Sequence, residues 1–253
     1  MQRVPVLVYH DIAPGRPPLS VAPALFEEHL DCLVDSGVTT LTASDLARAL
    51  LNDRLPARAV CLTFDDGFVS AADDAAPRLL ERGLSATVFC VAGYLGRTND
   101  WPSQPRWVQR RPLAPAERLR ELAAAGLEIG AHGFDHVALA HAGATAVRHE
   151  IVDARDALEQ AVGARVPVFA YPYGSLPAGE RRRLVAETYE AAFAAGARLA
   201  RAGDDPLALP RVDAHYLRRT EILRKVVLGG GGPYLAVRRA ASAGRRLVAR
   251  DAR

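Results

Sequence analysis

The chain has 253 residues, of which 49% are hydrophobic and 24% are charged, and its formal net charge is +3. This length and composition exclude a wholly disordered chain and are typical of a single α/β domain of barrel size. No stretch approaches the roughly 18 uninterrupted apolar residues of a membrane span, which excludes an integral helical membrane protein.

The first half of the chain alternates short apolar runs with helical patterns. VPVLVYH predicts a first strand, and apolar side chains at helical spacing predict a helix over 23–36 that stops at Gly37. After the short run TTL, Ser44 is the expected cap of the helix DLARALL. AVCLTF and SATVFCV predict buried strands, with the helix AADDAAPRLLERG between them.

The second half begins with residues 96–115, which contain four prolines and both tryptophans and predict an irregular insertion over a site. Helices are then expected over APAERLRELAAAG, GATAVRHEIVDARDALEQAVG and PAGERRRLVAETY. The expected strands are LEIGAH, VPVFAYP, AAFAAG and LALPRVDAHYL. Repeated β-α units of this kind predict a largely parallel sheet.

Two features bear on the cellular compartment. The three cysteines, Cys32, Cys61 and Cys90, sit in apolar runs without metal or redox spacings, which predicts buried reduced thiols. MQRVPVLVYHDI lacks the apolar segment of a signal peptide, so we expect a cytoplasmic protein. A leader removed beforehand stays open as the alternative.

Four side chains follow two of the predicted strands. Asp65 and Asp66 precede Gly67, and Asp-Asp-Gly is also common turn chemistry, so this pair alone indicates a turn as readily as a site. His132 and His136 of AHGFDH have a spacing that lets both imidazoles bind one ion. Because ligands bind where parallel strands end, the four groups predict a divalent metal site with one aspartate free as general base.

With these motifs the sequence resembles the NodB-homology polysaccharide deacetylases, carbohydrate esterase family 4, from VLVYHDI through PRVDAHYL. YPYG at 171–174 is similar to the family's third motif. The resemblance implies a deformed (β/α) barrel of seven strands that removes N-acetyl groups from sugars, with Asp65 as catalytic base and the Tyr173 N–H as oxyanion donor. The metal ligands that it implies are Asp66, His132 and His136. Zinc is the metal expected there, with cobalt and nickel as alternatives.

The sequence departs from the family pattern in three places. Ala170 replaces the arginine that orients the base, and Arg211 is the expected substitute, with Asp213 as its partner. Gly133 stands where serine or threonine is frequent, which predicts a different brace for the histidine loop. The late Leu-x-x-His motif has no clear match, so His215 is the expected general acid, with a merely packed histidine as the alternative.

Further side chains are expected to bind substrate because they fall at the same edge. They are His10, Tyr171, Pro172, Trp101 and Trp107. The two tryptophans can stack on sugar rings, and packing of the insertion onto the barrel is the alternative for them.

The predicted domains are a barrel over 1–228 and a basic C-terminal tail over 229–253 with a helical pattern. Residues 218–253 carry a net charge of +8, which leaves −5 for the rest of the chain. Apolar residues interleave with these arginines after GGGGP, which predicts either contact with an anionic membrane surface or an exposed charged helix.

The sequence therefore predicts a metal-dependent deacetylase of a carbohydrate or lipid-linked sugar, peripheral to the inner face of the membrane, with no nucleic-acid partner. A hydrolase of non-sugar amides or imides on the same fold is one alternative. A non-catalytic module that binds glycan or membrane is the other. Phosphoryl transfer is disfavoured because Gly67 stands where an Asp-x-Asp motif needs its second acid.

Overall fold

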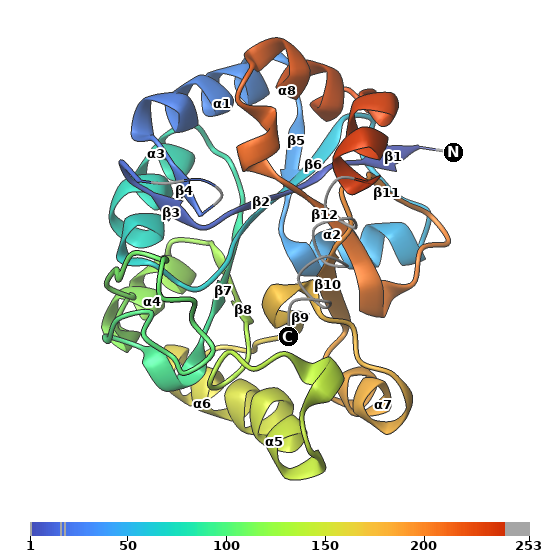
Figure 1. The fold of residues 1–253 in the computed structure, drawn as a ribbon. Helices are drawn as coiled ribbons and strands as arrows, with labels where there is room; N and C mark the ends of the chain where they lie inside the picture. The colour runs from blue at the N-terminus through green and yellow to red at the C-terminus, as the bar shows by residue number, and fades with distance from the viewer. Residues whose placement is uncertain (1, 16, 18, 241–253) are drawn as a thin grey trace.

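The computed structural model describes residues 2–15, 17 and 19–240, and its centre is a closed barrel of parallel strands (Figure 1). The seven barrel strands are β2 (Val6–Tyr9), β6 (Ala59–Phe64), β7 (Thr87–Cys90), β8 (Glu128–Ala131), β9 (Val168–Ala170), β10 (Ala191–Ala195) and β12 (Leu209–Asp213). The barrel closes where β2 pairs with β6. Adjacent strands β8 and β9 share a single register pair, Ala131 with Phe169. The predicted seven-stranded deformed (β/α) barrel is confirmed.

Among the described residues, five short strands lie outside the closed barrel. They are β1 (Arg3–Val4), β3 (Asp11–Ile12), β4 (Ser20–Val21), β5 (Thr39–Leu41) and β11 (Ala200–Arg201). Strand β5 pairs with the first half of β6, on the edge that β7 uses further along. Strand β1 pairs antiparallel with β11, and β3 pairs with β4.

Helices surround the barrel (Figure 1). They are α1 (Pro23–Asp35), α2 (Ala43–Leu51), α3 (Ala76–Glu81), α4 (Ala116–Ala124), α5 (Ala144–Arg148), α6 (Ala154–Val162), α7 (Gly179–Thr188) and α8 (Thr220–Val227). The long helix expected after residue 142 is helical throughout, but a π-helical turn, His149–Asp153, divides it into α5 and α6. A second π-helical turn, Ala71–Ala75, precedes α3.

The predicted cap of α2 was wrong by two residues. Thr42 has an extended backbone, and its hydroxyl oxygen accepts the Asp45 N–H at 3.2 Å, as an N-cap does. Ser44 lies inside the helix, where its N–H donates to Glu128 at 3.1 Å.

The core has an inner and an outer layer, because strand residues alternate between the barrel interior and the helices. Val6 belongs to the inner cluster with Phe89 and Phe193, whereas the next residue, Leu7, belongs to the outer one. Fully burying each such phenylalanine stabilises the fold by roughly 1.5–3 kcal/mol. The three cysteines are buried and unpaired, as predicted. With both faces covered, the strand ends are the place left for polar side chains.

The region of the predicted tail is described as far as residue 240. Residues 232–240 are helical, and Leu235 is buried in the outer core. Residues 241–253, with the remaining tail arginines, lie outside the described residues. None of the helices in the described ranges has the length and apolar composition needed to cross a membrane.

Candidate active site

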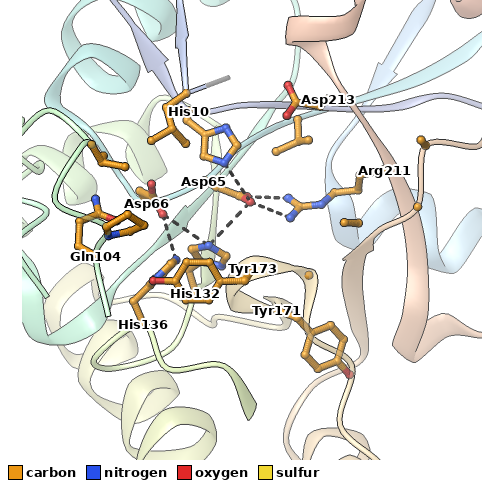
Figure 2. A pocket seen from close by; sticks show the side chains of 18 of the residues that line it. His10, Asp65, Asp66, Gln104, His132, His136, Tyr171, Tyr173, Arg211 and Asp213 are labelled. Carbon is orange, nitrogen blue, oxygen red and sulfur yellow. Dashed lines mark hydrogen bonds and ion pairs between the residues drawn. The ribbon is translucent and has the colours of Figure 1, made fainter. Parts of the chain in front are cut away.

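Three neighbouring strands, β12, β2 and β6, bring a cation, an imidazole and a carboxylate together at their carboxyl ends. The Arg211 guanidinium donates to both oxygens of Asp65, with Nη1 2.6 Å from Oδ1 and Nη2 2.7 Å from Oδ2. His10, at the end of β2 between them, has its Nε2 4.0 Å from Asp65 Oδ2 (Figure 2). The barrel order β6–β2–β12 therefore fixes this group.

Asp65 is a buried carboxylate that remains ionised. Burial alone would raise its pKa, but the charge of Arg211, with smaller effects of His132 and His10, holds the pKa well below its usual range. Asp65 is therefore a candidate general base that is ionised at neutral pH and fixed in direction by a two-point ion pair.

The expected pair of Arg211 with Asp213 was wrong, because both terminal nitrogens of Arg211 are turned to Asp65. Asp213 instead accepts the His215 N–H at 2.9 Å and so caps the turn after β12. Burial raises the Asp213 pKa, with an opposing effect of His10. Arg211 thus supplies the cation that Ala170, two strands away, does not.

Asp66, His132 and His136 form a compact buried cluster. Their ligand atoms all lie within 4.8 Å of one another, and Asp66 Oδ1 is 3.5 Å from His132 Nε2 and 3.4 Å from His136 Nε2. Among the described residues, no other group of three histidine, cysteine or acidic side chains lies close enough together to hold one metal ion.

The cluster fits a divalent metal by its donor chemistry. His132 Nδ1 donates to the Ala170 carbonyl at 2.8 Å, so its Nε2 lone pair faces the cluster. Burial lowers the His132 pKa to about 4, which keeps the imidazole neutral at pH 7. His136 Nδ1 is buried and has no hydrogen-bond partner among the described residues. Two neutral nitrogens and one carboxylate oxygen suit zinc or a similar ion.

The backbone of the site is strained. Asp66, His136 and Tyr173 have φ values of 70°, 58° and 58°, in the left-handed region that costs about 1–3 kcal/mol for residues other than glycine. Gly67 follows with φ 76°, and a Cβ there would lie 3.0 Å from Cys90 Sγ. Asp-Asp-Gly is therefore both a tight turn and part of the site.

A carboxylate that the sequence analysis missed braces the loop between the two histidines. Glu150 is 1% exposed on the π-helical turn, and it accepts the N–H groups of Phe134, Asp135 and Val137 at 3.1, 2.9 and 3.2 Å. Gly133 has φ 84°, and a Cβ there would lie 2.3 Å from Glu150 Oε2. The glycine therefore leaves room for the carboxylate, which explains the unusual residue in this motif.

A cavity of about 760 Å³, here called the central cavity, opens beside Asp65 and the metal cluster. The insertion walls it as expected, but the two tryptophans differ. Trp107 is 64% exposed at the cavity, whereas Trp101 is 1% exposed and its ring lies 4.4 Å from that of His136. Both rings line the cavity, but Trp101 packs against a candidate metal ligand and Trp107 is the more exposed of the two.

The remaining predicted residues are placed unequally. His10, Tyr171 and Tyr173 line the central cavity, but the Tyr171 hydroxyl donates to the Leu207 carbonyl and points away from the metal cluster (Figure 2). Neither Pro172 nor His215 is among the described residues that line it. The turn capped by Asp213 carries Tyr216 to the cavity instead of His215.

Gln104, Tyr216 and Arg239 also line the central cavity and were missed. They lie in the insertion, in a turn and in the final helix, where no motif marks them. Glu150 did leave a signal, because it is a charged residue beside Val147, Ile151 and Ala154 in an otherwise apolar helical stripe.

Comparison with known proteins agrees with this geometry. A family model described as polysaccharide deacetylase matches residues 52–192. YxkH of Bacillus subtilis, named as a polysaccharide deacetylase, is 28% identical over 173 residues, which are 68% of this chain and 57% of YxkH. The match therefore spans less than two thirds of that relative.

Solved structures share the fold. The Streptococcus pyogenes deacetylase PplD, solved in complex with acetate, has a TM-score of 0.71 and 26% identity, over 83% of this chain and 91% of PplD. IcaB from Ammonifex degensii has a TM-score of 0.71 and 23% identity, over 90% of this chain and 96% of IcaB.

Proposed function

The chain belongs to the polysaccharide deacetylase family, whose members hydrolyse amide bonds of sugars, and we propose that it removes N-acetyl groups from an amino sugar or glycan in a metal-dependent reaction. The observation that carries this proposal is the ionised Asp65, held by Arg211 beside the buried cluster of Asp66, His132 and His136.

Asp65 is the general base. It takes a proton from the attacking water, and the two-point contact with Arg211 fixes its direction and its charge. Asp66, His132 and His136 would hold the divalent ion, zinc in first place with cobalt or nickel as alternatives. Such an ion, when bound, polarises the acetamide carbonyl and raises the acidity of water.

The leaving amine needs a proton, and His10 is better placed than His215 to give it. His10 lines the central cavity and lies 4.0 Å from the base, whereas His215 is not among the described residues lining it. Asp213 lies beside His10 (Figure 2), and the interaction with His10 opposes the rise that burial gives the Asp213 pKa.

The Tyr173 backbone N–H is proposed as the oxyanion donor. The left-handed φ of 58° sets Tyr173 apart from ordinary turn residues, and its ring centroid lies 4.6 Å from that of His136. Its hydroxyl donates to Ser103 Oγ at 2.9 Å, which ties this segment to the insertion. A fixed N–H at the developing charge is the arrangement that stabilises tetrahedral intermediates.

The substrate and location follow from the walls of the cavity and the basic tail. Trp107 is the proposed platform for a sugar ring, while Trp101 keeps a packing role. A carbohydrate or lipid-linked sugar is the proposed substrate. Peripheral contact with an anionic membrane at the cytoplasmic face is proposed for the tail, on the net charge of +8 that residues 218–253 carry.

The test is acetate release from a panel of N-acetylated sugars by zinc-loaded protein, beside Asp65→Asn and the exposed control Asp156→Asn. Release that disappears in Asp65→Asn and survives in the control supports the proposal. Release that survives in both overturns the role of Asp65. If the protein binds metal but releases acetate from none of the sugars, a hydrolase of non-sugar amides becomes the better assignment. If the protein does not bind metal, a non-catalytic binding module becomes the better assignment.

A further inference from the structure

A second cavity of about 440 Å³ adjoins the central cavity, and Ala197 and Arg239 line both. Its walls are basic. We call this second cavity the arginine pocket, because four arginines line it: Arg3, Arg198, Arg201 and Arg239. They come from β1, from β11 and the loop before it, and from the helix at 232–240, which lie together in Figure 1. The charges therefore converge through the fold and not through one basic run of sequence.

A single carboxylate organises part of this pocket. Asp204 is almost buried, and its Oδ2 accepts from Arg198 Nη1 at 2.7 Å and from the Arg201 N–H at 3.0 Å. Arg3 and Arg239 have no carboxylate within 4.0 Å in the described part of the chain. Four guanidinium groups against one carboxylate leave a net charge of +3.

The strand register makes this charge costly without a ligand. Arg3 on β1 pairs directly with Arg201 on β11. Like charges opposite each other on neighbouring strands destabilise a sheet. Folding alone would favour a neutral or acidic residue at one of the two positions, and an anion between them would offset the repulsion.

We propose that the arginine pocket binds a phosphate or diphosphate group of the substrate, so that the enzyme deacetylates a phosphorylated amino sugar. The inference rests on the proposed deacetylase function. Guanidinium groups match phosphate oxygens two at a time, and a charge of +3 suits a diphosphate better than a single carboxylate. Because the two cavities share Ala197 and Arg239, one ligand can place its acetamide near Asp65 and its phosphate on the arginines.

The first test is kinetic and separates the two sources of such a phosphate. Acetate release by the zinc-loaded full chain is measured on N-acetylglucosamine, its 1-phosphate, a nucleoside diphosphate N-acetylglucosamine, and a polyprenyl diphosphate N-acetylglucosamine in detergent micelles. We expect kcat/KM to be at least about tenfold higher, mainly through KM, for phosphorylated sugars than for the neutral one. A preference that extends to the 1-phosphate or to the nucleoside diphosphate sugar assigns a soluble substrate, and one confined to the polyprenyl compound assigns a lipid-linked substrate. Equal kcat/KM for all four overturns the proposal.

Arginine variants test whether the preference for phosphorylated sugars arises in the arginine pocket. Arg3→Gln combined with Arg239→Gln should reduce the preference for phosphorylated sugars by about tenfold, since both lost guanidinium groups would donate charge-assisted hydrogen bonds to the phosphate. Arg165→Gln combined with Arg183→Gln removes the same charge at exposed positions and should keep the preference. An equal loss in both double variants means general electrostatic attraction and overturns the pocket.

The second test does not need turnover. Binding of inorganic pyrophosphate to the zinc-loaded protein is measured by calorimetry in the wild type and both double variants. We expect about tenfold weaker binding only when Arg3 and Arg239 are replaced. No binding, or binding unchanged by that replacement, overturns the pocket even if neutral sugars are deacetylated. Binding that depends on the arginines, without hydrolysis of any acetamide, supports the pocket and refutes the deacetylase function instead.

Discussion

Replacing Glu150 with glutamine should weaken metal binding, although Glu150 is not itself a candidate ligand. Its carboxylate accepts three backbone N–H groups of the histidine loop, one on Oε1 and two on Oε2. Glutamine keeps one acceptor oxygen and turns a donor toward the other N–H groups. Because a hydrogen bond to a charged group contributes roughly 1.5–3 kcal/mol, losing one or two should cost about 3 kcal/mol.

Part of that cost should appear as loss of loop order, and therefore as weaker zinc binding. A cost of about 3 kcal/mol corresponds to roughly a hundredfold in the dissociation constant if all of it is expressed there. The assay is competition with a chromophoric zinc chelator, in parallel with thermal unfolding of the metal-free protein. Glu187→Gln, on an exposed face of α7, is the matched control and should leave zinc affinity unchanged.

Two results would refute the reasoning. One is wild-type zinc affinity in Glu150→Gln. The other is a lower unfolding temperature with unchanged zinc affinity, which would make Glu150 a structural residue only. Gly133→Ala offers a second approach, because its Cβ would lie 2.3 Å from Glu150 Oε2. Its effect should be non-additive with that of Glu150→Ala in a double-mutant cycle.

Three further predictions concern the base, pH and the cavity wall. Arg211→Met removes the cation that pairs with the buried Asp65 carboxylate, so the Asp65 pKa should rise and the free energy of unfolding should fall by about 3–5 kcal/mol. The acidic limb of the kcat/KM pH profile should then move toward neutral pH, and an acidic limb that does not move contradicts this prediction. Burial lowers the His29 pKa from 6.5 to about 4, so the unfolded chain binds more protons between these values. The free energy of unfolding should therefore decrease as the pH is lowered through this range, by up to ~1.4 kcal/mol per pH unit. His29→Gln should flatten that slope in urea unfolding, and an unchanged slope would count against it. Trp107→Ala should raise KM for oligomeric glycans about fivefold without lowering the unfolding temperature, whereas Trp101→Ala should cost about 3–5 kcal/mol of stability; the reverse pattern would exchange their roles.

The barrel was predictable because its strands are buried on both faces and therefore stand out as unbroken apolar runs between helical patterns. The exact ends of the helices were harder to predict from the sequence. Thr42 and Ser44 are both good caps in sequence, and the choice depends on the contact of Ser44 N–H with Glu128, 84 residues away. The π-helical turns add a residue to a turn without any change in residue type that would mark them.

Within the site, sequence order indicated which side chains reach the carboxyl edge but not which way they point. His10 and His215 both follow barrel strands, and the Asp213 cap after β12 makes the difference between them. Arg211 was found because it stands on a predicted strand, although its carboxylate partner follows another strand, 146 residues away. The arginine pocket could not be predicted, since it joins residues near both ends of the chain with a loop.

Strands β8 and β9 share a single register pair, so backbone pairing between them is weak, and the candidate site lies at this junction of the barrel, here called the β8–β9 seam. His132 follows β8, and its Nδ1–H crosses the seam to the carbonyl of Ala170 on β9. A side-chain hydrogen bond thus links two strands that elsewhere in the barrel are held together by backbone hydrogen bonds. An ion that holds His132 in place should therefore also hold the seam shut, so amide hydrogen exchange in β8 and β9 should slow on zinc loading while exchange in β2 and β6, joined by four register pairs, stays unchanged.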